Sequence, residues 1–312
     1  QRYTESVNRY LYIIKRQLSR QSSHWQNWIE VGAGNDSNAN NGIEDEFINV
    51  PWLGDIRLFE QSREIDSGFF EAQAQVLYAK PISQQQSWYA GVNVQSTQYS
   101  DALAWDRTYF SLLAGYQSQW RAIAFDFSVF HKPLRLDEES YLDYSGMVVN
   151  GAYPLSNFSL IGASVSYAVE SYQQSNSQDK EQFVSALWFE YERQQLQHKL
   201  VVRIAGENAK TAGSSHVGRN LWGASYQLLW QLNQAFVFSG KVDYLNGEHR
   251  APEPLFLTTR KTELSRIEAR LDYYFSPHWR ASITINHMSH SSNIALYDYD
   301  RSKAMASIRY SF

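Results

Sequence analysis

Side chains alternate between apolar and polar at every second position along most of this chain, and this period limits what the chain can fold into. The clearest run is 263–275, in which apolar residues such as Ile267 and Leu271 alternate with charged residues such as Arg266 and Arg270. Successive side chains of a β-strand point to opposite faces of the sheet. The period therefore predicts long strands with one apolar face and one polar face.

Fourteen segments carry this pattern, and the connections between them alternate between short and long. The short ones run from two to seven residues, whereas the long ones include 35–64, 133–140 and 247–262. Short turns at one end and long loops at the other are typical of a membrane β-barrel. The predicted strands are 25–34, 65–79, 87–98, 107–119, 122–132, 141–153, 158–171, 180–193, 198–207, 220–232, 235–246, 263–274, 279–290 and 300–312.

Strand length and composition favour a membrane barrel over a soluble β-sandwich. Most of the predicted strands have about 10–14 residues, whereas ordinary strands have about 5–6 and a tilted membrane strand needs about 9–11. Aromatic residues make up 15% of the chain, although its mean hydropathy is negative, at -0.48. Among β-sheets, only a closed one leaves no unpaired backbone groups in the hydrocarbon of the membrane. We therefore predict an all-β fold, a closed antiparallel transmembrane β-barrel of about 14 strands, in the bacterial outer membrane.

Charged residues in the middle of the predicted strands should line a water-filled lumen. They could form an electrostatic filter or a track for cargo. Because their signs are mixed, the favoured alternative is that they pair with one another as a ladder of ion pairs that stiffens the wall. The expected lumen-lining residues are Glu71, Asp126, Arg203, Lys241, Asp243, Arg266, Glu268, Arg270, Asp272 and Arg309.

Residues 1–24 are predicted to form a periplasmic helix and linker, and 25–312 the barrel. Apolar residues recur at three- and four-residue spacing between Tyr3 and Leu18, which indicates one amphipathic helix over 3–20. An even number of strands places both ends of a barrel on the same side, here the periplasm.

The longest connection, 35–64, is expected to be ordered rather than freely solvated, because it holds many apolar residues. It should pack on the barrel wall or enter the lumen. It is also the connection expected to touch a partner, because binding residues are often found on loops. Its expected plug or partner residues are Phe47, Trp52, Leu53 and Phe59.

Nothing in the sequence predicts a cofactor, a metal site or an enzyme. The chain has no cysteine and a net charge of -4 without a basic stripe, so nucleic acid is not an expected partner. The oxygen-rich stretch Asn35–Glu46 lacks the spacing of a known calcium loop. His287 and His290 lie near Ser291, but on a strand the two imidazoles would face opposite sides.

Two local patterns resemble those of known proteins. The ending Tyr310-Ser311-Phe312 resembles the signal by which the barrel assembly machinery recognises outer-membrane proteins, carried by Tyr310 and Phe312. The opening stretch Trp28–Asn40 ends in Asp-Ser-Asn-Ala-Asn. It resembles the start of barrels fused behind periplasmic tetratricopeptide repeats, such as the surface lipoprotein assembly modifiers.

This second resemblance implies a translocation or export pore for a protein or polysaccharide cargo. It also implies a periplasmic repeat domain or partner acting with the barrel. The alternative is a diffusion porin or small-solute channel, because fourteen strands fall between small filled barrels and wide porins. Outer-membrane lipids, including lipopolysaccharide, and the barrel assembly machinery are expected partners in either case.

Overall fold

A computed structural model describes residues 23–312, and the helix predicted over 3–20 lies outside them. Fourteen strands form one closed barrel, which confirms the predicted fold class. The barrel strands are β1 (His24–Asp36), β4 (Ser67–Ser83), β5 (Gln86–Tyr99), β6 (Arg107–Trp120), β7 (Ile123–Leu136), β8 (Glu139–Ser156), β9 (Ser159–Tyr172), β10 (Lys180–Arg193), β11 (Leu196–Ala209), β12 (Arg219–Gln231), β13 (Phe236–Glu253), β14 (Thr258–Tyr274), β15 (Trp279–Ser292) and β16 (Tyr299–Ser311).

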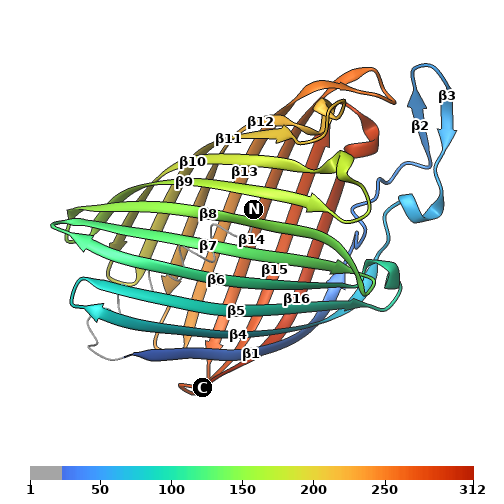
Figure 1. The fold of residues 1–312 in the computed structure, drawn as a ribbon. Helices are drawn as coiled ribbons and strands as arrows, with labels where there is room; N and C mark the ends of the chain where they lie inside the picture. The colour runs from blue at the N-terminus through green and yellow to red at the C-terminus, as the bar shows by residue number, and fades with distance from the viewer. Residues whose placement is uncertain (1–22) are drawn as a thin grey trace.

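Each barrel strand pairs antiparallel with its neighbours in the chain, and β1 pairs with β16 to close the ring (Figure 1). We call this closing pair the seam; its register runs from Trp28 opposite Ser311 to Asp36 opposite Lys303. Within residues 23–312, no helix has the length and apolar character needed to cross a membrane. Five short 3-10 turns lie in the loops: Glu60–Ser62, Leu103–Trp105, Asn176–Gln178, Ser215–Val217 and Ala295–Tyr297.

The two ends of the barrel differ, as the alternation of connections predicts. At the turn end most strands are joined by two-residue turns, and at the loop end by longer loops. The longest loop, 37–66, contains a small separate hairpin of β2 (Phe47–Val50) and β3 (Gly54–Arg57). This hairpin projects beyond the loop end of the barrel (Figure 1).

Two loops predicted from the sequence are wrong, because the strands on either side continue through them. β7 and β8 meet at a two-residue turn, Asp137 and Glu138, which both have positive φ as a tight hairpin turn requires. β13 and β14 likewise extend to the connection 254–257. In both places the pairing continues through a shift of register, near Pro133 and near Pro252. Such irregularities accommodate a residue that cannot donate to the ladder.

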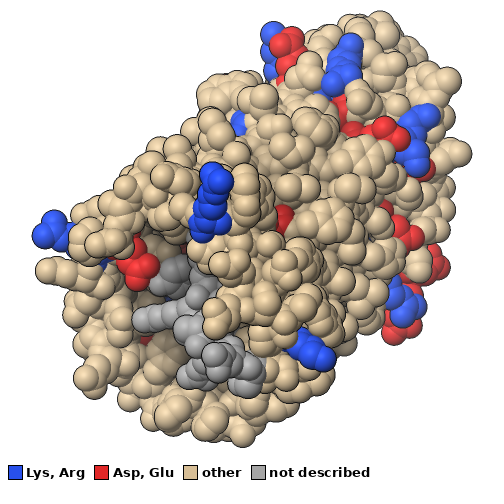
Figure 2. Space-filling model, turned by 60° about the vertical axis from the view of Figure 1, so that its left-hand side comes forward, with Lys and Arg blue, Asp and Glu red and all other residues tan. Residues whose placement is uncertain are grey.

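The outer wall is apolar, as expected for a surface that meets lipid. Outward side chains such as Ile267, Phe127 and Val149 are exposed to about half their surface. In Figure 2, charged residues gather toward the loop end, and much of the wall between the two ends carries none. Aromatic side chains cluster at the turn end, where Trp279 lies 4.8 Å from Tyr310 between ring centres. Such a girdle marks the level of the lipid headgroups.

Candidate functional site

The inner face of the barrel is the candidate site, because it is where polar and charged side chains gather. All ten residues predicted to line the lumen lie on this face, at alternate positions to the exposed apolar residues. Most are bonded to other inward residues from neighbouring strands.

The largest group of inward charges joins the two ends of the chain across the seam. We call it the seam cluster. Glu30 of β1 accepts hydrogen bonds from three arginines of β14, β15 and β16. Arg270 and Arg280 each place a guanidinium nitrogen 3.2 Å from a Glu30 oxygen, and Arg309 also contacts it. Asp272 binds Arg270 at 2.7 Å. Two carboxylates therefore hold three guanidinium groups in a buried network.

Other predicted residues form smaller inward pairs. Asp243 lies 2.5 Å from Lys241 and 3.8 Å from Arg203, so two cations share one carboxylate. Glu71 of β4 binds Lys303 of β16 at 2.9 Å. Further contacts join Asp126 to Tyr89 and Asn150, Glu268 to Asn286, and Arg266 to the sulfur of Met288.

The sequence reasoning missed a second charged group near the loop end, centred on Glu207. This carboxylate is 1% exposed and binds Lys180 at 3.0 Å and Arg219 at 2.9 Å. All three follow the same alternation, but they fall at or beyond the ends of the predicted strands. A longer strand would have placed Arg219 on the inner face, because β12 begins at that residue. Glu30 was missed although it alternates with the exposed Ile29 and Val31.

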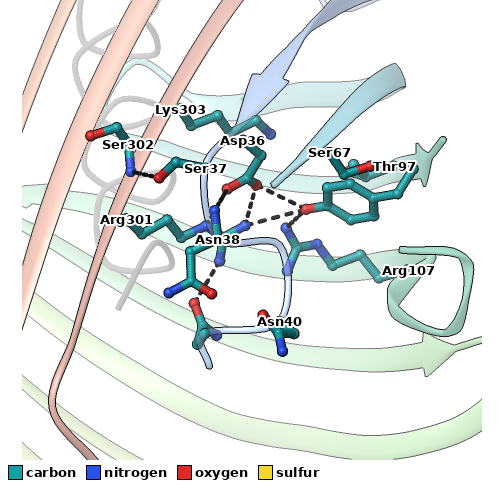
Figure 3. Close-up of polar contacts among 12 residues, drawn as sticks. Asp36, Ser37, Asn38, Asn40, Ser67, Thr97, Arg107, Arg301, Ser302 and Lys303 are labelled. Carbon is teal, nitrogen blue, oxygen red and sulfur yellow. Dashed lines mark hydrogen bonds and ion pairs between the residues drawn. The ribbon is translucent and has the colours of Figure 1, made fainter. Parts of the chain in front are cut away.

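The oxygen-rich start of loop 37–66 forms a set of hydrogen bonds that we call the clasp (Figure 3). Asp36 is fully buried and pairs with Arg301 of β16, while the Tyr99 hydroxyl donates to it at 3.0 Å. Ser37 extends the pairing to Ser302 through two further hydrogen bonds. The Asp-Ser motif thus ties the first residues of the loop to the seam.

Asn38 and Asn40 continue the clasp by holding the loop to itself and to the barrel. The Asn38 amide donates to the carbonyls of Gly42 and Asp300, at 2.8 and 2.9 Å. The Asn40 amide donates to the carbonyls of Gln61 and Arg63, and its oxygen accepts from two backbone N–H groups. These side chains therefore form hydrogen bonds with backbone groups. Residues 23–312 contain no group of three acidic, histidine or cysteine side chains placed to hold a metal ion.

The apolar residues of loop 37–66 pack against two neighbouring loops. Ile43, Ile48 and Val50 are buried together with Phe256 and Ile294, which come from the β13–β14 and β15–β16 connections. We call this layer the roof. The loop is therefore ordered and packed on the barrel.

The four residues predicted as plug or partner contacts are instead the exposed members of this loop. Phe47, Trp52, Leu53 and Phe59 are 52–83% exposed. The indole N–H of Trp52 donates to the carbonyl of Leu255 at 2.8 Å. They lie in or beside the hairpin outside the mouth rather than in the lumen, and contact with a partner stays a prediction.

Replacing Asn40 with alanine should loosen the loop without unfolding the barrel. The change removes four hydrogen bonds from backbone groups that are partly buried, at a cost of about 1–3 kcal/mol for groups left unsatisfied. We expect limited proteolysis to cut loop 37–66 at least several times faster. Asn49→Ala is the control, because Asn49 bonds only the exposed side chain of Asp55. Equal cleavage of the two variants would contradict a clasp.

The histidines near Ser291 do not form a catalytic arrangement. His287 lies on the exposed side of β15 and contacts the Ser302 hydroxyl at 2.9 Å. His290 faces inward, where its ring stacks on Tyr299 with centres 5.0 Å apart. The two imidazoles therefore point to opposite faces, as expected from their spacing.

Comparisons with known proteins agree with the fold. The chain matches no protein-family model and no curated protein sequence. Among solved structures it is similar to OmpT, an outer membrane protein of Vibrio cholerae, with a TM-score of 0.53, 6% identity, and coverage of 93% of this chain and 98% of that one. An anion-selective porin from Comamonas acidovorans gives a TM-score of 0.52 at 7% identity, with coverage of 93% of this chain and 99% of that one. A Pseudomonas aeruginosa FadL homologue gives a TM-score of 0.51 at 7% identity, with coverage of 93% of this chain and 90% of that one.

These similarities and the closed apolar-walled barrel define the class of protein: a β-barrel of the bacterial outer membrane. Tyr310 and Phe312, the residues of the expected assembly signal, lie in the last strand and directly after it, with their rings 5.8 Å apart. Their recognition by the assembly machinery stays a prediction.

Proposed function

We propose that this chain is an outer-membrane channel whose lumen carries hydrophilic, preferentially anionic, solutes without chemical change. The observation that carries the proposal is the excess of cations in the inward clusters. The seam cluster holds three arginines against two carboxylates. Asp243 is likewise shared by Lys241 and Arg203. Fixed charges lining a pore favour the passage of ions of the opposite sign.

The pairing of these charges also supports a wall-stiffening role, and the two roles are compatible. An ion pair holds each side chain in place, while the surplus guanidinium gives the seam cluster a net positive charge. One fold neighbour is described as an anion-selective porin. That description belongs to the neighbour, and for this chain anion preference is our proposal.

Replacing Arg203 with glutamine should reduce anion preference while leaving the barrel stable. Asp243 keeps Lys241 at 2.5 Å, so no buried carboxylate loses all its partners. In planar bilayers under a salt gradient, we expect the wild type to give a reversal potential of the anion-selective sign and Arg203→Gln to shift it toward zero. Lys261→Gln removes the same charge from an exposed side chain and should have no effect. A cation-selective or non-conducting wild type would contradict the proposal.

Export of a protein or polysaccharide is the second candidate function. It is supported by the resemblance of Trp28–Asn40 to barrels behind periplasmic repeats, and by the exposed apolar side chains of the β2–β3 hairpin, which suit a protein partner. Deletion of the gene would then abolish secretion of a specific cargo. The pure barrel would give no steady conductance without its partner, whereas a solute channel would conduct alone.

A further inference from the structure

Four nitrogen-bearing side chains converge on the inner face near the loop end, beneath the roof. We call them the mouth cluster: Arg219, His249, Arg260 and His290, from the four successive strands β12 to β15. The Arg260 Nε donates to His249 Nε2 at 3.0 Å. Arg219 lies near enough to interact electrostatically with the other three.

The orientation of Arg260 is fixed from two sides. His249 Nδ1 lies 2.6 Å from the carbonyl of His216, so Nδ1 carries the proton and Nε2 accepts from Arg260. The Arg260 guanidinium carbon lies 3.8 Å from the centre of the Tyr297 ring, a cation–π contact. Tyr297 packs against the roof. Burial there raises the pKa of its hydroxyl, which keeps it neutral.

Arg260 has no anionic partner at ion-pair distance among residues 23–312. Arg219 beside it is held by Glu207 at 2.9 Å, whereas none of the described carboxylates lies within 4.0 Å of Arg260. Glu253 acts on it electrostatically from farther away. A partly buried charge without a partner is costly, and an oxyanion from outside the protein would supply the missing charge.

We propose that the mouth cluster binds one oxyanion, the carboxylate or phosphate group of a solute entering the lumen. With Nε occupied by His249, the other edge of the Arg260 guanidinium remains able to donate two parallel hydrogen bonds to an oxyanion. Arg219 adds a second positive charge, and His249 is a positioning residue. This inference rests on the proposed function, since it makes the cluster the entry site of an anion channel.

Phosphate binding to the purified whole chain tests the site. Inorganic phosphate is titrated calorimetrically into the protein in detergent free of lipopolysaccharide, and we expect saturable binding to the wild type. Arg260→Gln should weaken that binding at least tenfold. Lys261→Gln is the matched control: it removes a positive charge at the next position of β14, where the side chain is 65% exposed and pairs with Glu248. It should bind phosphate as the wild type does.

A second variant, Arg219→Gln, tests the site if Arg260→Gln does not fold. Arg219→Gln leaves Glu207 paired with Lys180 at 3.0 Å, so it should fold and also weaken phosphate binding severalfold. Absence of saturable binding to the wild type, or equal affinity in Arg260→Gln, would overturn the site. Displacement of phosphate by lipopolysaccharide, with no displacement by small organic phosphates or carboxylates, would overturn the assignment to a solute.

Conductance separates this inference from the proposed function. An anion-selective wild type whose affinity for phosphate is unchanged by Arg260→Gln would refute the mouth site and leave the channel standing. A wild type that binds phosphate through Arg260 but gives no bilayer conductance would refute the channel and leave the binding site standing.

Discussion

Replacing Glu30 with alanine should destabilise the barrel by about 3–5 kcal/mol, the cost of removing one partner from a buried ion pair. Glu30 is 6% exposed and accepts from Arg270, Arg280 and Arg309. Without it, Arg270 and Arg280 would share the carboxylate of Asp272, and Arg309 would lose its ion pair with Glu30. Because these arginines lie on the last three strands and Glu30 on the first, the seam loses a buried link on its inner face.

Urea unfolding of the refolded barrel in lipid vesicles, followed by tryptophan fluorescence, measures this loss. Glu248→Ala is the matched control, because Glu248 pairs with Lys261 while both side chains are at least 60% exposed. Exposed pairs contribute about 0–1 kcal/mol, so the control should unfold close to the wild type. A Glu30→Ala barrel as stable as this control would show that the seam cluster does not hold the barrel closed.

Replacing Gly34 with valine should prevent the seam from pairing. An added Cβ at Gly34 would lie 1.9 Å from the Ala304 carbonyl oxygen of β16, so the two backbones would have to separate. Overpacking costs typically about 1–3 kcal/mol, and more where backbone atoms cannot move aside. Separation would also strain the adjoining clasp, in which Asp36 binds Arg301 and Ser37 binds Ser302.

Loss of the folded band on unheated electrophoresis would measure this failure of closure. Gly151→Val is the matched control, because an added Cβ there meets nothing closer than 4.0 Å. We expect Gly151→Val to fold and Gly34→Val to remain largely unfolded in the same refolding reaction. Normal folding of Gly34→Val would mean that β1 and β16 can separate at little cost.

The strand period determined much of this protein before any tertiary contact was known. Because a strand places alternate side chains on opposite faces, Ile267 and Arg266 could be assigned to lipid and lumen from their positions alone. Strand ends were harder to place. The segments around Pro133 and Pro252 were predicted as loops but continue as strands, because the pairing tolerates a shift of register there.

What only the tertiary structure decided is which inward groups meet. Glu30 and Arg270 are 240 positions apart, and their contact exists because the ring closes at β1 and β16. The same closure explains the Asp-Ser-Asn-Ala-Asn stretch as a clasp. The fold likewise orients Arg260 by His249 and Tyr297, with no carboxylate of residues 23–312 at ion-pair distance. The alternation of apolar and polar residues predicts the face of the sheet on which a side chain lies. Its partners depend on the curvature and register of a closed sheet, which bring distant strands together across the lumen.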